Sequence, residues 1–359
     1  MSLSRTSVLE KDLLERLREL SPGNARAMAA TIVAISDADG ASRIDALVDS
    51  LMGRRPARVI HARAHVTGGE DRSWSSARCS LDRQRRGVCF EDLYIETGNA
   101  RAWDTRIWSD LVIRELPALV LAAAENFPTP EGARDFLNFA DLMLVDPEGF
   151  GIPRADPLLL HKRIETLPLV DLTWERLLPV RMAVSRLFEG DDYVERLSLL
   201  KSVRIRGLKP WSASLTAAWL ATRLGLRAPK ASGSADGVPG SKGVIGSGSW
   251  IRLSGFSVNF EIDTSGTTVG VDFSFEDGSS MELVFPTERE AVLVRHPAPD
   301  MRLSFPKPDD GAILARLLDA PLVDPLYADA LAALAQAVDG KVRRRPSWLG
   351  NNGTEDSCL

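Results

Sequence analysis

The sequence predicts an α/β N-terminal domain with a mainly parallel sheet, followed by an α+β C-terminal domain with an antiparallel meander. Two observations lead to this fold class. Near the N-terminus, apolar and partly β-branched runs alternate with a helical pattern, which is typical of parallel strands joined by right-handed crossovers. Near the C-terminus, runs with a two-residue alternation are separated only by turn residues, which is typical of antiparallel strands.

We divide the chain into four segments. Residues 1–23 are expected to form an N-terminal helix, residues 24–165 the α/β domain, residues 166–342 the α+β domain and residues 343–359 a disordered tail. A chain of 359 residues is long enough for two domains, because one core typically serves about 100–200 residues. Residues 231–249 are rich in Gly and Ser, which predicts a flexible loop inside the second domain.

The α/β domain begins with a predicted strand, helix and strand. Residues 29–35 and 57–63 have the apolar, β-branched character of buried strands. A strand, a helix and a second strand within about 35 residues form a βαβ unit, which predicts that the two strands pair in parallel. The helix between the strands has one apolar face, formed by Ile44, Leu47, Val48 and Leu51. Further strands are predicted at residues 87–95, 119–121 and 136–145.

The second domain changes from helices to strands along the chain. Helical spacing of apolar residues predicts helices, and alternation predicts strands. The predicted helices cover residues 174–187, 193–200, 212–224 and 325–338. An exposed strand is predicted at residues 202–206, and the strands of the meander at residues 250–262, 268–275, 281–285 and 291–296.

Composition excludes several classes of function. The net charge of −5 comes from nearly balanced acidic and basic residues, so the chain has no field that would attract nucleic acid or an anionic membrane. No stretch reaches 18 apolar residues, so we expect no transmembrane segment. Three cysteines in a chain of this length do not form a disulfide framework. We therefore expect a soluble, cytoplasmic protein.

Motifs for phosphate, dinucleotide or metal binding are not complete in the sequence. The segment Gly240-Ser241-Lys242-Gly243 has its lysine one place late for a phosphate-binding loop and lacks the hydroxyl that should follow. His61 and His65 would share one face of a strand roughly 13 Å apart, too far to ligate one metal ion. The sequence therefore predicts no catalytic residues, no cofactor and no metal site.

Cys79 and Cys89 leave two interpretations open. They are ten residues apart and outside any Cys-x-x-Cys pattern, which favours buried, inert thiols. Two neighbouring strands could also bring them together as a redox pair. We expect that reductant and oxidant have little effect on the protein's activity.

Tryptophan and arginine residues supply the candidates for a partner interface. These two residue types are enriched at interface hot spots, but they also cover the edges of domains, and the sequence does not separate the two roles. Residues 174–181 form a further block, in which Trp174, Leu177, Leu178 and Arg181 fall on one helical face. The interface candidates are Trp74, Arg78, Arg83, Trp103, Trp108 and Arg181.

The order of several segments resembles the OpcA family. The most informative block is Asp171-Leu172-Thr173-Trp174-Glu175-Arg176-Leu177-Leu178-Pro179-Val180-Arg181. It is similar to the family's Asp-Leu-x-Trp-x-Arg-Leu-x-x-Trp-Arg segment, with Val180 where the family often has Trp. Other similar segments are residues 58–60, 88–93, 115–117, 139–146, 203–205 and 215–225.

The resemblance implies a protein that binds glucose-6-phosphate dehydrogenase, promotes its active oligomer and raises its activity in the oxidative pentose phosphate pathway. It implies an allosteric activator without catalytic activity of its own. In photosynthetic relatives this effect is tied to thiol redox state. The alternative is an α/β enzyme or binding protein for sugar phosphates, with its ligand at the strand ends of the first domain.

Overall fold

The computed structural model describes most of the two expected domains. The predicted N-terminal helix, the C-terminal tail and residues 231–247 of the Gly/Ser-rich loop lie outside the described residues. Within the described part, no helix has the length and apolar character needed to cross a membrane. The described residues are 28–37, 40–65, 71–81, 87–98, 104–123, 138–149, 156–165, 168–189, 191–227, 248–252, 257–295, 298–306, 309–320 and 323–338.

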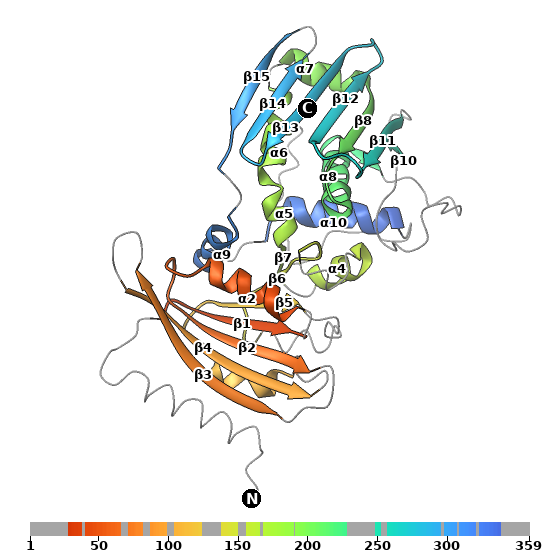
Figure 1. Cartoon of the computed structure of the whole chain (residues 1–359). Helices are drawn as coiled ribbons and strands as arrows, with labels where there is room; N and C mark the ends of the chain where they lie inside the picture. Colours follow the sequence, from red (N-terminus) through yellow and green to blue (C-terminus); the bar gives the residue numbers. More distant parts are fainter. Residues whose placement is uncertain are drawn as a thin grey trace, which may run out of the picture.

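The first sheet has seven strands in the order β3-β4-β2-β1-β5-β6-β7 (Figure 1). Every neighbouring pair is parallel except β3 with β4. The predicted mainly parallel sheet is therefore confirmed. The strands are β1 (Ala30–Ser36), β2 (Ala57–His65), β3 (Arg72–Leu81), β4 (Gly87–Gly98), β5 (Ala118–Ala123), β6 (Leu142–Val145) and β7 (Leu169–Asp171).

The central strands β1, β5 and β6 are buried along their whole length, which explains their continuous apolar sequences. Helix α2 (Ala41–Ser50) covers one face with Ile44, Leu47 and Val48. Trp108 and Leu111 pack in the other core cluster, together with Val33 and Val120 of the sheet. Trp108 lies between the short 3₁₀ turns η2 (Thr105–Ile107) and η3 (Ser109–Leu111), and Leu111 ends η3.

The second sheet has eight strands in the order β15-β14-β13-β12-β8-β11-β10-β9. The predicted antiparallel meander is confirmed from β12 to β14, and β15 extends it. Its predicted first strand, residues 250–262, is two strands, β10 and β11, and β11 pairs in parallel with β8 instead of lying beside β12. The strands are β8 (Leu200–Arg206), β9 (Leu226–Arg227), β10 (Gly248–Arg252), β11 (Ser257–Asp263), β12 (Val269–Phe275), β13 (Ser280–Thr287), β14 (Glu290–Arg295) and β15 (Ala298–Ser304).

Strand β8 corrects the expectation of an exposed strand. It lies in the middle of the sheet, antiparallel to β12 and parallel to β11. Val203 and Ile205 are fully buried, whereas Lys201 and Arg204 are exposed. The alternation of apolar and polar residues was visible in the sequence. The exposed polar residues do not make β8 an edge strand, because one face of an interior strand can still meet water.

Helices lie between and beside the two sheets (Figure 1). The predicted helix at residues 174–187 is broken into α5 and α6 at Leu177, and Pro179 lies in the first turn of α6. The predicted common face of Trp174, Leu177, Leu178 and Arg181 is therefore interrupted, and Leu178 is 46% exposed. The helices are α4 (Pro157–Ile164), α5 (Leu172–Arg176), α6 (Leu178–Leu187), α7 (Asp191–Arg196), η4 (Leu197–Leu199), α8 (Pro210–Arg223), α9 (Asp310–Asp319) and α10 (Pro325–Val338).

Helix α9 returns the chain from the second sheet to the first domain. Its leucines Leu314, Leu317 and Leu318 join the core that α2 forms on the first sheet. At Gly311 a Cβ atom would lie 1.9 Å from the carbonyl oxygen of Ser50, so only glycine permits this close approach. Strand β7 and helix α9 both extend the first domain beyond the boundary predicted at residue 165, because both pack with its sheet or helix.

Candidate functional site

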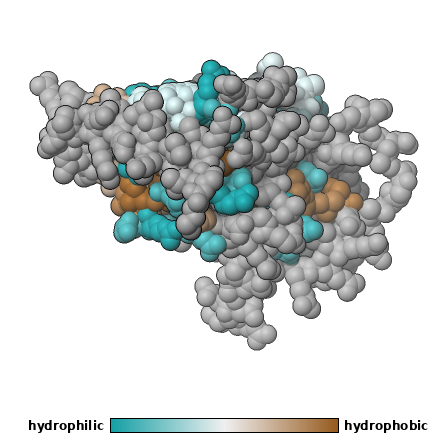
Figure 2. Space-filling model, turned by 90° about the horizontal axis from the view of Figure 1, so that it is seen from below, coloured by the Kyte–Doolittle hydropathy of each residue, from teal (hydrophilic) through white to brown (hydrophobic). Residues whose placement is uncertain are grey.

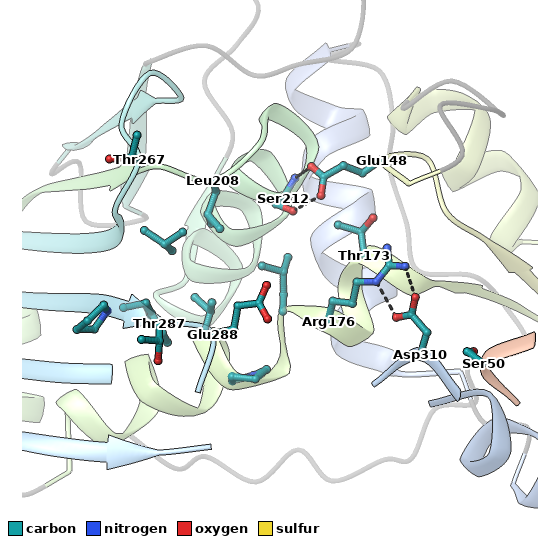
Figure 3. A pocket seen from close by; sticks show the side chains of 16 residues that line it. Ser50, Glu148, Thr173, Arg176, Leu208, Ser212, Thr267, Thr287, Glu288 and Asp310 are labelled. Carbon is teal, nitrogen blue, oxygen red and sulfur yellow. Dashed lines mark hydrogen bonds and ion pairs between the residues drawn. The ribbon is translucent and has the colours of Figure 1, made fainter. Parts of the chain in front are cut away.

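A cleft of about 750 Å³ lies between the two domains (Figure 3). One side is formed by the loop after β6, by α5 and by the start of α9. The other side is formed by the first turn of α8, the start of β12 and the end of β13. Clefts between domains and at the carboxyl ends of parallel strands are common ligand-binding places. We therefore treat this cleft as the candidate site.

Arg176 joins the walls of the cleft on the side of the first domain. Its Nε and one terminal nitrogen donate to the two carboxylate oxygens of Asp310, at 2.9 and 2.7 Å. The other terminal nitrogen donates to Asp146 at 2.7 Å. Burial lowers the pKa of Arg176, but the bonds to Asp310 and the charge of Asp146 outweigh it and raise the pKa above its usual value. The guanidinium therefore stays charged, and all three of its nitrogens have carboxylate partners.

Asp146 shapes the loop after β6. Its buried carboxylate accepts the backbone N–H of Gly149 at 2.8 Å and the hydroxyl of Thr173 at 3.3 Å. A Cβ atom at Gly149 would lie 2.0 Å from Asp146 Oδ2, so any other residue here would displace the Asp146 carboxylate.

The loop after β6 carries Glu148 across to the second domain. Glu148 accepts the hydroxyl of Ser212 at 2.8 Å and the backbone N–H of Ser212 at 3.3 Å. Glu148 thus satisfies the first turn of α8, where the helix dipole favours an anion.

We call three buried residues the junction cluster: Asp171 at the start of α5, Trp174 in α5 and Arg181 in α6. Asp171 begins α5 by accepting the N–H of Thr173 at 2.8 Å, and it also accepts the indole N–H of Trp211 at 2.7 Å. Burial raises the pKa of Asp171 to about 7, although the bond from Trp211 acts in the opposite direction. Asp171 therefore ties β7 to α8 through neutral donors.

Trp174 and Arg181 stack within the junction cluster. Trp174 is 1% exposed and donates its indole N–H to Asp324 at 2.8 Å. The Arg181 guanidinium carbon lies 3.6 Å from the centre of the Trp174 ring system, a cation–π contact. Burial lowers the pKa of Arg181 to about 10. Arg181 is only 7% exposed, so its prediction as an interface residue does not fit the fold.

The other interface candidates fall into three groups. Trp108 is 0% exposed and packs edge-on to Phe139, so it offers no surface to a partner in this conformation, and its role at an interface stays a prediction. Arg83 and Trp103 lie outside the described residues. Trp74 and Arg78 are partly exposed on β3 and remain candidates. Seen from below the first sheet, the described surface shows hydrophilic and hydrophobic groups in separate small patches (Figure 2).

Trp74, Arg78 and Asp92 belong to what we call the outer network. Trp74 stacks on Tyr94 with ring centres 4.7 Å apart, and Tyr94 stacks on His61 at 4.2 Å. Arg78 donates two bonds to the buried Asp92, at 2.6 and 2.9 Å. Burial raises the pKa of Asp92, but the bonds from His61 and Arg78 prevail and leave it below its usual value. Among the described residues no His, Cys, Asp and Glu cluster could hold a metal ion.

Cys79 and Cys89 are joined by a disulfide and lie directly opposite each other in the β3–β4 pair. The preferred interpretation of buried, inert thiols is therefore wrong. Cys79 is exposed and Cys89 half-buried, because β3 is an edge strand. Next along β4, Phe90 aligns with Ala57, the first residue of β2. The disulfide thus lies near the amino ends of the parallel strands, whereas Glu148 and Thr173 of the cleft follow the carboxyl ends of β6 and β7.

One comparison with known families concerns the second domain. Residues 167–331 match the family model for the C-terminal domain of a glucose-6-phosphate dehydrogenase subunit. The match covers just under half of the chain and includes the junction cluster, α8 and the meander. No curated protein matches the sequence.

Several solved structures are similar to the chain at low identity. UDP-N-acetylglucosamine 3-dehydrogenase GnnA from Acidithiobacillus ferrooxidans has 12% identity and a TM-score of 0.44, covering 89% of this chain and 100% of its own. An inositol dehydrogenase homolog from Azotobacter vinelandii has 11% identity and a TM-score of 0.42, and the similarity covers 90% of this chain and 91% of that one. An aldose-aldose oxidoreductase from Caulobacter crescentus has 13% identity and a TM-score of 0.44, and the similarity covers 88% of this chain and 98% of that one. We draw no functional conclusion from similarities at this level.

The residues that build the cleft were not among the sequence-based candidates. Asp146, Glu148, Ser212 and Asp310 come from separate segments, and nothing in their local sequence marks them as neighbours of Arg176. The one available signal was the block from Asp171 to Arg181, which supplies the back of the cleft and Arg176 itself.

Proposed function

We propose that this chain is a non-catalytic partner of glucose-6-phosphate dehydrogenase, which it binds and stabilises in an active oligomer in the cytoplasm. The observation that carries this proposal is the family match over residues 167–331. The resemblance of the sequence to the OpcA family over a longer part of the chain supports it. To shift the dehydrogenase tenfold toward the active form, the chain must bind that form more tightly by about 1.4 kcal/mol.

The side chains of the described cleft fit a role without catalysis. The charged groups on the first-domain side are bonded to one another, with Arg176 held by Asp146 and Asp310. Asp171 has a pKa near 7, but it is fully buried and its partners are Trp211, Tyr327 and a backbone N–H. A general base must reach a proton on a substrate, and this carboxylate faces protein on every side.

The proposal is tested with both purified proteins. The cognate dehydrogenase is assayed alone and with increasing amounts of the chain, and its oligomeric state is followed by analytical ultracentrifugation. We expect a saturable rise in dehydrogenase activity together with a larger sedimenting species. The chain alone should turn over neither glucose 6-phosphate nor other sugar phosphates with either nicotinamide cofactor.

Two results would contradict the proposal. The first is an unchanged rate and sedimentation of the dehydrogenase at equimolar and tenfold excess chain. The second is turnover of a sugar phosphate by the chain alone, which would support the enzyme alternative. A pull-down from native cells, using the chain as bait, gives an independent check on the partner.

A further inference from the structure

Within the described part of the chain, the two sheets end in four edge strands, β3, β7, β9 and β15. Natural proteins protect edge strands from pairing with other chains by keeping them short or by placing a proline or a bulge in them. Strands β7 and β9 have three and two residues. Strand β15 contains Pro299, and its pairing with β14 shifts register between Leu293 and Arg295. These three edges are therefore protected.

Strand β3 lacks these protections. It has ten residues and no proline, and its pairing with β4 continues without a shift along the whole strand. Charged side chains can also protect an edge, but both arginines of β3 are paired within the chain. Arg72 pairs with Glu96 at 3.3 Å and Arg78 with Asp92 at 2.6 Å. The outer edge of β3, which no described strand covers, can therefore accept a further strand (Figure 1).

The geometry of the β3–β4 pair indicates which backbone groups point outward. The Cα atoms of Cys79 and Cys89 lie 4.0 Å apart, the close spacing of an antiparallel pair without mutual hydrogen bonds. Such pairs alternate with hydrogen-bonded ones, so Ser73, Ser75 and Ala77 also direct their N–H and C=O groups away from β4. These groups form the row that a further strand would bond.

A row of stacked rings crosses the first sheet and ends at β3. His61 on β2, Tyr94 on β4 and Trp74 on β3 are neighbours in the strand register. Their ring centres are 4.2 and 4.7 Å apart, with interplanar angles of 9° and 5°. This spacing is close to the distance between strands, so the next ring of the row would belong to a strand beside β3. Tyr94 covers one face of the partly exposed Trp74 ring, and the other face is directed to that position.

We propose that two copies of this chain associate through β3, with the strands antiparallel and Trp74 of one copy opposite Trp74 of the other. A two-fold axis brings the same surface of both copies together, so the free end of each ring row meets an identical free end. Trp74 is bonded to β4 and makes no backbone bonds to the new strand, and at such positions opposite side chains lie closest. Aromatic pairs stabilise these positions. The inference does not depend on the proposed function.

The side chains beside the tryptophans fit this register. Arg72 lies opposite Ser76 of the second copy, and Ser73 lies opposite Ser75 of the second copy. No two like charges face each other, and the small side chains leave room for the indoles. The paired segment is short, and an interface below the standard size of about 1,600 Å² is typically weak. We therefore expect a dimer that forms and separates with protein concentration.

Sedimentation equilibrium of the full chain tests the association. We expect the average mass to rise from one copy toward two between about 1 and 200 µM protein, the range of weak interfaces. Trp74→Ala should weaken the dimer by about tenfold or more. Met301→Ala is the matched control, because it removes an exposed apolar side chain from the edge strand β15, and it should leave the dimer unchanged. A wild type that stays monomeric throughout, or equal effects of the two variants, overturns the proposal.

Ser75→Pro tests the backbone of the same edge. Because the N–H of Ser75 points away from β4, proline removes a bond to the second copy and none within the sheet. The variant should melt like the wild type and remain monomeric. Dimerisation of Ser75→Pro with the affinity of the wild type would show that β3 is not the contact.

Two charged variants test the register and do not depend on how Ser75→Pro folds. Trp74→Glu and Trp74→Lys each place like charges opposite each other at the two-fold axis, so each alone should be monomeric. Mixed in equal amounts at low salt, they should associate about threefold or more tightly than either alone, because opposite charges then face each other. A mixture that associates no better than the single variants overturns the register, and so does self-association of Trp74→Glu.

A strand of the dehydrogenase is the competing occupant of this edge. Complex formation with glucose-6-phosphate dehydrogenase is therefore compared for the wild type and Ser75→Pro. If the wild type is monomeric alone and Ser75→Pro loses the complex, the edge belongs to the dehydrogenase and the proposal is wrong. If the wild type dimerises and Ser75→Pro still forms the complex, the second copy is the occupant of β3.

Discussion

The junction cluster and the outer network contain the same three residue types and behave in opposite ways. Each has one Asp, one Trp and one Arg, and each Asp is buried. In the junction cluster, burial raises the pKa of Asp171 and lowers that of Arg181. In the outer network, the pKa of Asp92 is lowered, and bonds to Asp92 raise that of Arg78 above its usual value.

The difference comes from which groups touch each other. Asp92 is bonded to the Arg78 guanidinium, so its charge is compensated. Asp171 is bonded to an indole and a backbone N–H, which are neutral. Arg181 does not contact Asp171 but lies over the Trp174 ring, with the carboxylate of Asp324 3.6 Å away. Burial of a charge is costly unless an opposite charge meets it. The outer network is therefore most stable when Asp92 is ionised, whereas the junction cluster is most stable when Asp171 is neutral.

The largest expected effect is that of truncating the junction tryptophan. Trp174→Ala removes a fully buried indole, its bond to Asp324 and its contact with Arg181. We expect it to lower the free energy of unfolding by roughly 3–5 kcal/mol, as large-to-small changes in cores do. Urea denaturation followed by circular dichroism measures it.

Trp74→Ala is the matched control in the outer network. Trp74 is half exposed and contacts Tyr94 through one ring face, so we expect a loss of about 1 kcal/mol or less. Equal losses of unfolding free energy in Trp174→Ala and Trp74→Ala would mean that the two tryptophans are equally well packed. The contrast between the junction cluster and the outer network would then be wrong. A Trp174→Ala protein that unfolds like the wild type but fails to bind the dehydrogenase would place Trp174 at the partner interface.

The second prediction concerns how stability depends on pH. The folded-state pKa of Asp171 is about 7, above its unfolded value of about 3.9. A raised pKa gives stability that is fully present below the unfolded pKa and is lost as pH rises through the folded pKa. The wild type should therefore lose roughly 1 kcal/mol per pH unit between about pH 4 and 7 relative to Asp171→Asn, which does not ionise. Denaturant unfolding of both proteins from pH 5 to 8 measures the change.

Asp92→Asn should show the opposite sign. The lowered pKa of Asp92 gives stability that is present above the unfolded pKa and is lost as pH falls through the folded pKa. The wild type should therefore be more stable than Asp92→Asn at pH 7, and this advantage should shrink below about pH 4. If both variants differ from the wild type by a constant amount across pH, the assigned charge states of the two carboxylates are wrong.

The smallest expected effect on activation of the dehydrogenase is that of reducing the Cys79–Cys89 disulfide. The bond closes a short hairpin whose strands are already paired, so its removal should cost at most about 3 kcal/mol. Because it lies near the amino ends of the strands, away from Glu148 and Thr173, we expect activation of the dehydrogenase to stay nearly unchanged. Activation is measured before and after dithiothreitol, with Cys79→Ser as a second route to the same state. If both the reduced protein and Cys79→Ser fail to activate the dehydrogenase, the disulfide end of the β3–β4 pair is needed for activation.

Much of the first sheet could be predicted from the sequence, because its central strands are buried on both faces. Strands β1, β5 and β6 are continuous apolar runs, and such runs need no knowledge of their neighbours. Strand β3 was missed because an edge strand rich in Ser and Arg has no apolar alternation. Without β3 the register that places Cys79 opposite Cys89 could not be derived, and the disulfide was missed with it.

The cleft could not be predicted because its contacts join distant segments. Arg176 and Asp310 are 134 residues apart in sequence, and neither has a local pattern that identifies the other. Trp108 and Trp74 show the same limit in the choice of interface residues. Both occur in polar, Arg-rich sequence, yet one is fully buried and the other is partly exposed. Tertiary packing decides between them, and residue type does not.

The return of α9 to the first domain has a mechanical consequence. The chain passes from the first sheet to the second through α5 and α6, and it comes back after β15 to place α9 on α2 (Figure 1). After α9 the chain crosses a third time, into α10, which packs against α8 and α4. The cleft borders the first two crossings, with Arg176 at the end of α5 bonded to Asp310 at the start of α9. Three crossings and one continuous apolar core join the two sheets, so the backbone itself limits how far the two domains can move apart.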